Sequence, residues 1–178
     1  MVTDICNVIE RIYIKEDHSF FIAQCQRKLD FIDALLENLR DRLKNIRLCD
    51  NPGDPSAEVI FDLDHFFQSE FKVQYTSILL VSKIHDIFYL QHGFAVDNLD
   101  INRMCSVLDG FGDQAYSKQQ YDLEKIVTDY LYNLNYKKMK YAEMVEVIPM
   151  VDMPTNCIFG SQMTVENALF KDVWNICP

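Results

Sequence analysis

Apolar residues recur at intervals of three and four along most of the chain, which is the spacing of amphipathic helices. The longest such stretch predicts a helix that begins at Asp17 or Ser19 and ends near Arg47. Its apolar stripe consists of Leu29, Ile32, Leu35, Leu36, Leu39, Leu43 and Ile46. A short helix capped by Thr3 is predicted before it, because a threonine hydroxyl can accept a hydrogen bond from the first helical N–H groups.

Three further helices are predicted in the second half of the chain. Ser117 and Gln120 form a capping box in front of a helix with the apolar positions Leu123, Ile126, Val127, Tyr130, Leu131 and Leu134. Asp100 is predicted to cap a short helix that ends at Gly110, and Thr164 to cap a final helix.

The central segment, from Asp54 to Gly93, is also predicted to be helical. The break Asn51-Pro-Gly-Asp-Pro makes Asp54 a cap and places Pro55 at the first helical position, with Gly93 as the stop. The apolar pattern allows one helix as far as His92, or two helices divided near residues 69–76.

A strand signal is confined to the region near the C-terminal end of the sequence. Met144–Val151 is β-prone and contains Pro149, which suits only an edge strand, and Ile158 with Phe159 could pair with it. The chain is therefore predicted to be all-α, a compact multi-helix bundle or orthogonal array, with room for one short β-hairpin. Residues 1–178 are predicted to form a single helical domain.

The charge of the chain limits the kinds of partner that it can bind. The chain has 178 residues, with 17 basic and 27 acidic side chains and a formal net charge of −10. This balance argues against nucleic acid as the main partner, because phosphate binding needs a cationic surface. Neither a signal peptide nor a membrane span is predicted, which favours a cytosolic protein with no membrane partner.

The cysteines and the candidate metal motifs indicate neither a zinc site nor an enzyme. The six cysteines are scattered with no C-x-x-C pair, so free thiols are expected. Asp62-Leu63-Asp64 resembles a metal-binding D-x-D element, but two residues spaced by two point apart on a helix. Without a G-x-S-x-G or P-loop motif, no catalytic residue, cofactor or metal is predicted.

His85-Asp86 resembles the core of the HD-domain metal phosphohydrolases, which are all-α. That resemblance would give His65 and Asp129 as the remaining ligands of a divalent metal. The family follows its pair with a small residue and a lysine, where this chain has the bulky Phe88 and Tyr89. These aromatic residues favour packing at the edge of a core helix over a metal pocket.

Two groups of residues are candidates for binding a partner. Between Leu48 and Phe71 there is no lysine or arginine, and the six carboxylates are Asp50, Asp54, Glu58, Asp62, Asp64 and Glu70. Asp54, Glu58 and Asp62 are spaced by four, which would align them on one face of a helix. Tyrosines cluster between residues 116 and 141, and Tyr132 and Tyr136 are expected to be exposed, where they could contact another protein.

In size, acidity and this acidic run, the chain resembles the small immunity proteins of bacterial toxin systems, including contact-dependent growth inhibition. The resemblance implies a protein that binds a cationic toxin domain, such as an EndoU-type RNase or another nuclease, and covers its active site. The predicted partner-binding residues are Asp54, Glu58, Asp62, Asp64, Glu70, Tyr132 and Tyr136. The alternatives are a regulatory or structural helical interaction protein and, less favoured, an HD-type phosphohydrolase.

Overall fold

The fold is mixed α/β and is organised around a large antiparallel sheet, so the all-α prediction is wrong. The computed structural model describes residues 3–43, 45–100, 102, 108–154 and 161–177. The main sheet has the strand order β1-β2-β4-β5-β6, with β3 pairing to β4 and β7 pairing in parallel to β5. A second sheet consists of β8 and β9.

The elements are as follows. The strands are β1 (Asn45–Cys49), β2 (Ser56–Asp62), β3 (Phe66–Gln68), β4 (Phe71–Ser82), β5 (Ile87–Asn98), β6 (Leu108–Gly112), β7 (Lys137–Met139), β8 (Val147–Asp152) and β9 (Gln162–Thr164). The helices are α1 (Thr3–Ile9), the π-helical η1 (Glu10–Ile14), α2 (His18–Cys25), α3 (Phe31–Leu39), α4 (Lys118–Asn133), α5 (Tyr141–Met144) and α6 (Val165–Phe170).

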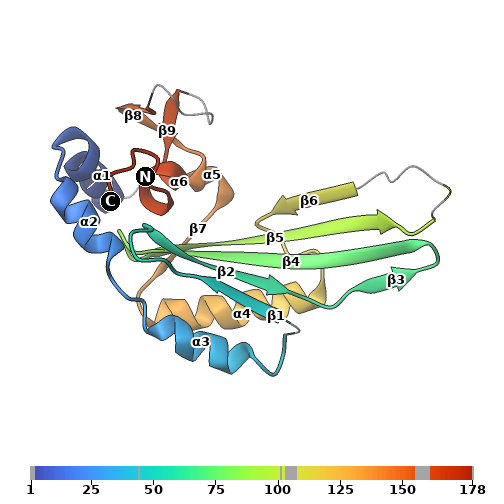
Figure 1. The fold of residues 1–178 in the computed structure, drawn as a ribbon. Coiled ribbons are helices and arrows are strands. Elements are labelled where there is room, and N and C mark those ends of the chain that lie inside the picture. Colours follow the sequence, from blue (N-terminus) through green and yellow to red (C-terminus); the bar gives the residue numbers. More distant parts are fainter. Residues whose placement is uncertain (1–2, 44, 101, 103–107, 155–160, 178) are drawn as a thin grey trace.

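Strands β4 and β5 form a long hairpin that spans the molecule. Their register runs without a break from Phe71 opposite Asn98 to Val81 opposite Phe88. The hairpin turn, residues 83–86, lies near α2, and the far ends of the two strands project past α3 and α4 (Figure 1). We call this projecting part, residues 64–75 and the described residues of 94–112, the arm.

The two faces of the sheet are buried by different elements. On one face, side chains such as Val59, Leu79 and Leu90 lie opposite one another and form a core with α3 and α4. On the other face, at the turn end of the hairpin, Ile87 and Tyr89 belong to a second core with the N-terminal helices, β8, β9 and α6. The turn end of β5 is therefore buried on both sides.

The predicted helix from Asp54 to His92 is instead made of strands β2 to β5. In β2 and the residue after it, the buried positions Ala57, Val59, Phe61 and Leu63 alternate with less buried ones. This period of two is that of a strand with one buried face. Gly93, predicted as a helix stop, lies in the interior of β5 opposite Thr76.

The predicted long helix to Arg47 is broken into α2, α3 and β1. Asp17 does cap α2, because its side chain accepts a hydrogen bond from the N–H of Phe20. Ile46 and Arg47, assigned to the helix from sequence, pair with β2 as part of the edge strand β1. Pairing with β2 gives the backbone N–H and C=O groups of Ile46 and Arg47 hydrogen-bond partners, as a continued helix would have done.

Other predictions from sequence are confirmed. Helices α1, α4 and α6 are present, and Ser117 and Gln120 form the predicted capping box of α4. Pro149 lies in strand β8, whose partner is β9. The predicted partners Ile158 and Phe159, and most of the helix predicted after Asp100, lie outside the described residues.

Gly110 of β6 permits a close approach that no larger residue allows. A Cβ atom added there would lie 2.7 Å from the ring of Phe94, whereas one added at Gly93 would have only ordinary contacts, the nearest at 3.6 Å. Because the Phe94 ring is itself held against Tyr116, with ring centroids 4.7 Å apart, it has little room to move. We expect Gly110→Ala to lower the free energy of unfolding by about 1–3 kcal/mol.

Urea unfolding of the two variants checks this expectation. Gly93→Ala is the matched control, since it makes the same substitution in the adjacent strand, and we expect a change within about 1 kcal/mol of wild type. Equal stability of Gly110→Ala and Gly93→Ala would contradict the packing described for Phe94.

Candidate functional site

The predicted acidic residues do not lie on one surface. Asp54 is exposed in the loop before β2, where its carboxylate accepts a hydrogen bond of 2.8 Å from Asn51. Glu58 and Asp62 share the face of β2 that points away from α3 and α4. Asp62 is already engaged there, because it accepts a hydrogen bond from Asn45 and forms an ion pair of 3.4 Å with Arg47.

The remaining two acids lie toward the other end of the sheet. The backbone N–H of Asp64 donates to the side chain of Gln119, in the first turn of α4, at 3.0 Å. Glu70 is exposed in the turn between β3 and β4, at the tip of the arm. The acidic run of the sequence thus follows the sheet along its length instead of lining one helix.

The two predicted tyrosines have different environments. Tyr132 on α4 is 52% exposed, and its ring lies 6.1 Å from that of Phe88. Tyr136, expected to be exposed, is only 7% exposed, and its ring contacts that of Phe31 at 5.1 Å. Burial raises the pKa of Tyr136 above its ordinary value. Tyr136 therefore belongs to the core and cannot contact a partner as predicted.

The residues suggested by the HD resemblance are not brought together. His85 and Asp86 lie in the turn between β4 and β5, His65 follows β2, and Asp129 is on α4. His85 lies near Asp4, with an N–O distance of 3.4 Å, and Asp86 lies near Arg27. Within the described part of the chain, no three His, Cys, Asp or Glu residues are grouped as metal ligands.

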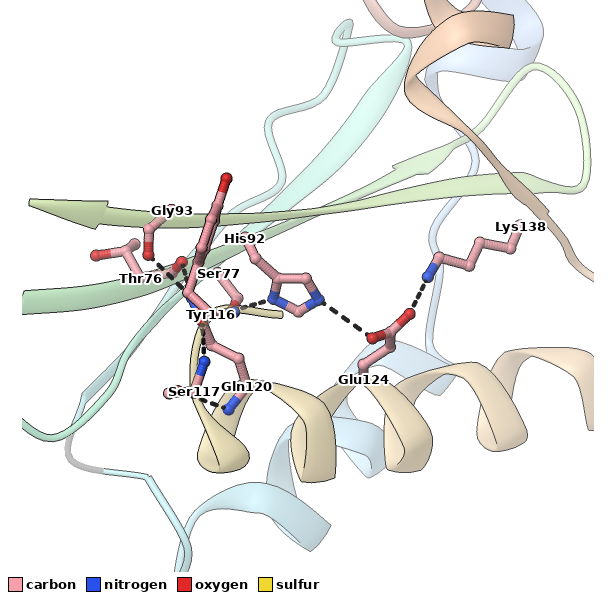
Figure 2. Close-up of polar contacts among 9 residues, drawn as sticks. All are labelled: Thr76, Ser77, His92, Gly93, Tyr116, Ser117, Gln120, Glu124 and Lys138. Carbon is pink, nitrogen blue, oxygen red and sulfur yellow. Dashed lines mark hydrogen bonds and ion pairs between the residues drawn. The ribbon is translucent and has the colours of Figure 1, made fainter. Parts of the chain in front are cut away.

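A polar chain that sequence reasoning missed lies between the sheet and α4 (Figure 2). The Oγ atom of Ser77 is 2.8 Å from Nδ1 of His92, whose Nε2 is 3.6 Å from the carboxylate of Glu124. That carboxylate also forms an ion pair of 2.5 Å with Lys138. The signal that could have found it is a serine and a histidine whose neighbours two positions away on each strand are large and apolar or aromatic.

These residue types resemble a serine–histidine–acid catalytic set, but their setting is structural. Ser77 and His92 are both 0% exposed, so neither side chain can meet a substrate. Burial lowers the pKa of His92, which the carboxylate of Glu124 opposes. We infer a neutral ring whose Nδ1 accepts from Ser77. Its buried Nε2 atom has no hydrogen-bond partner, because the carboxylate of Glu124 is 3.6 Å away.

Gln120 fastens the start of α4 to the same strands. Its side-chain N–H groups donate to the carbonyls of Thr76 and Gly93, at 3.0 and 2.9 Å. Its side-chain oxygen accepts from the N–H groups of Tyr116 and Ser117 (Figure 2). Gln120 therefore fixes the position of α4 on β4 and β5, which makes this network part of the scaffold.

The arm carries an apolar surface that α3 and α4 do not cover. The register places Phe66, Val73, Val96 and Leu108 in one row across β3, β4, β5 and β6. Partners directly opposite in antiparallel strands share a face, so this row lies on one side of the arm. Phe66 is 54% exposed and Leu108 is 64% exposed, with Phe71 also exposed on this face.

We call this row the arm row, and the arm that carries it is rich in carboxylates. The acidic residues of the arm are Asp64, Glu70, Asp97, Asp100 and Asp109, and among its described residues the only lysine or arginine is Lys72. Asp97 lies opposite Lys72 and accepts a hydrogen bond from Gln74. Asp97 and Asp109 lie on the face opposite the arm row, since they alternate with Val96 and Leu108. The arm therefore combines one face with exposed apolar side chains and an overall negative charge.

Comparisons of the chain with protein-family models, with curated proteins and with solved structures give no match. Among the residues that the structure describes, no helix is long and apolar enough to cross a membrane. The arm, which exposes apolar side chains and carries a negative charge, is the candidate functional surface.

The buried position of His92 predicts a specific dependence of stability on pH. Its pKa is lowered from the ordinary value of 6.5 in the folded protein. As the pH falls through that value, the unfolded chain binds a proton that the folded chain does not, so the free energy of unfolding decreases. The contribution of this one group is at most about 1.4 kcal/mol per pH unit.

Urea unfolding from about pH 7.5 to about pH 5.5 measures this effect. We expect His92→Asn to be less stable at neutral pH and to lose part of the pH dependence. An unchanged difference between the two pH values in the variant would show that His92 does not bind its proton as described.

Proposed function

We propose that this protein is a protein-binding module whose arm binds a cationic protein partner. The observation that carries the proposal is the arm row, which exposes apolar side chains in one line on a projecting part of the sheet. Water contact with apolar surface is unfavourable, and contiguous exposed apolar patches mark binding sites in soluble proteins.

The arrangement of apolar and charged groups supports this proposal. Protein interfaces have an apolar centre with aromatic anchors and a polar rim. Here the anchors are Phe66, Phe71 and Leu108, and Glu70 lies in the turn next to Phe71 at the edge of this surface. Asp109 pairs with Ala95 on the opposite face of the arm, where it adds to the negative charge. The rim and the net charge of −10 favour a basic partner, because complementary charge accelerates encounter and disfavours acidic partners.

Within this class we propose an immunity protein that neutralises a cationic toxin nuclease in the cytoplasm. A projecting arm with carboxylates can enter the phosphate-binding cleft of a nuclease, where its negative charges replace those of the substrate. The carboxylates predicted from sequence that remain in this proposal are Asp64 and Glu70. Asp54, Glu58 and Asp62 lie outside the arm and are proposed to add only long-range attraction.

The first test removes the apolar anchors. The probe is the cationic nuclease domain encoded beside the gene for this protein, and binding is measured as a dissociation constant. We expect Phe66→Ala and Leu108→Ala each to weaken binding by about tenfold or more, as interface anchors do. Both side chains are exposed, so stability should change by only about 0.5 kcal/mol.

Tyr121→Ala is the matched control, because Tyr121 is 61% exposed on α4, outside the arm. Its binding should equal that of wild type. Wild-type affinity in both arm variants would exclude the arm row, and the lack of any such nuclease domain would exclude the immunity role.

The second test reverses charge on the arm. We expect Glu70→Lys with Asp109→Lys to slow association about tenfold or more at low ionic strength, since exposed charges attract a partner over roughly 8 Å at physiological salt. The effect should shrink as salt is added, which stopped-flow or biosensor association rates would show.

Charge reversal of Glu58 and Asp62 to lysine tests whether the partner binds the arm or the face of β2 that carries these two residues. These residues lie on β2, and Asp62 is already paired with Arg47. We expect a smaller loss of association rate there. A larger loss at β2 than on the arm would place the binding surface on the open face of the sheet.

A further inference from the structure

Two cysteines far apart in the sequence meet at the turn end of the hairpin. Cys25, in the last turn of α2, is 0% exposed and belongs to the core beneath the N-terminal helices. Cys177 is half-buried and packs against the same core. The two thiol groups lie close enough to affect each other's pKa, and both cysteines are free.

The segment that carries Cys177 is held in place by specific contacts. The carboxylate of Asp172 accepts hydrogen bonds from the N–H groups of Ile176 and Cys177, at 2.8 and 2.7 Å. Trp174 packs its ring against that of Tyr13, with centroids 5.4 Å apart. These contacts hold the segment that carries Cys177 against η1.

The loop between β1 and β2, which contains Gly53, lies next to Cys177. A Cβ atom added at Gly53 would lie 3.7 Å from the Cβ of Cys177, so the loop between β1 and β2 borders the site. In that region the buried Lys83 forms an ion pair of 2.6 Å with Asp50 and donates to the carbonyl of Asn51. The thiol pair therefore lies where α2, this loop and residues 172–177 meet.

We propose that Cys25 and Cys177 form a reversible disulfide that responds to peroxide. The Cys177 thiolate attacks one oxygen of hydrogen peroxide, the O–O bond breaks, and hydroxide leaves as the sulfur becomes a sulfenic acid. The Cys25 thiolate attacks that sulfur, the S–O bond breaks, and a second hydroxide leaves. In total, two thiols lose two electrons and two protons, and one peroxide becomes two waters.

The surroundings determine the order and speed of these steps. Burial raises the pKa of both thiols, which leaves little thiolate at neutral pH and makes the reaction slow. Cys177 is the more exposed of the two, so peroxide reaches it first. Loosening of residues 172–177 should speed the first step, because it exposes the Cys177 thiol to solvent.

The bond would join α2 to residues 172–177 across nearly the whole length of the sequence. A cross-link that closes a long loop restricts the unfolded chain, which stabilises the folded state in the chain-entropy model. The expected consequence is a protein whose turn end becomes more stable under oxidation.

The test treats the purified full chain with hydrogen peroxide and maps the products by mass spectrometry without reduction. We expect one linked peptide pair containing Cys25 and Cys177, and a melting temperature raised by about 5–10 °C. A dithiol reductant should reverse both changes, and Cys25→Ser or Cys177→Ser should abolish them.

Cys49→Ser is the matched control, since it removes an exposed thiol from β1 and leaves the pair intact. Asp172→Asn, with Cys25 and Cys177 retained, weakens the hydrogen bonds to the N–H groups of Ile176 and Cys177. Oxidation of the two cysteines should then be severalfold faster. Oxidation that leaves Cys25 and Cys177 free to react with an alkylating agent after unfolding, or that links either one elsewhere, would overturn the proposal.

Discussion

The register of β4 against β5 is the constraint on which the rest of the structure depends. It joins Phe71–Val81 to Phe88–Asn98 in one unbroken ladder. Because side chains alternate between the faces of a strand, a shift of one strand by one residue would turn its buried side chains to the other face of the sheet. The present register places Leu79 and Leu90 under the helices and keeps Ser77 opposite His92, so that these two buried side chains hydrogen-bond each other.

The buried polar groups explain how α4 is positioned on this sheet. An apolar seam alone would allow a helix to slide or rotate with little cost, since apolar contacts are non-directional. Hydrogen bonds from Gln120 to the carbonyls of Thr76 and Gly93 permit only one placement. A displaced helix would leave these two carbonyls without the Gln120 donors, at roughly 1–3 kcal/mol for each group.

The sequence could predict helices whose signals are local, and α4 is the clearest case. Its capping box and its apolar spacing of three and four agree with each other, and both require only neighbouring residues. The prediction of a helix for the central segment was wrong because residues four apart share a face both on a helix, with a period of 3.6 residues, and on a strand, with a period of two. Glu58 and Asp62 lie on one face of a strand just as they would on a helix.

Alternation of apolar and polar residues, the other signal of a strand, is missing where both faces of the sheet are buried. Ile87, Phe88, Tyr89 and Leu90 are all buried, because two separate cores cover the turn end of β5. Alternation is lost in such a run, and periodicity alone cannot separate it from a buried helix. The arm row was equally hidden, since its members come from four strands and become neighbours only through pairing.

The two ends of the hairpin can therefore carry separate tasks. Ten residue steps of β4 separate Val81, near the turn, from Phe71 on the arm, a span of roughly 33 Å at the usual rise of a strand. The thiol pair lies at the turn end and touches none of the arm row. A disulfide there would add stability through α2 and residues 172–177, while the paired strands hold the arm in the same geometry. Oxidation should thus raise the stability of the folded protein without changing the arm surface that is proposed to bind a partner.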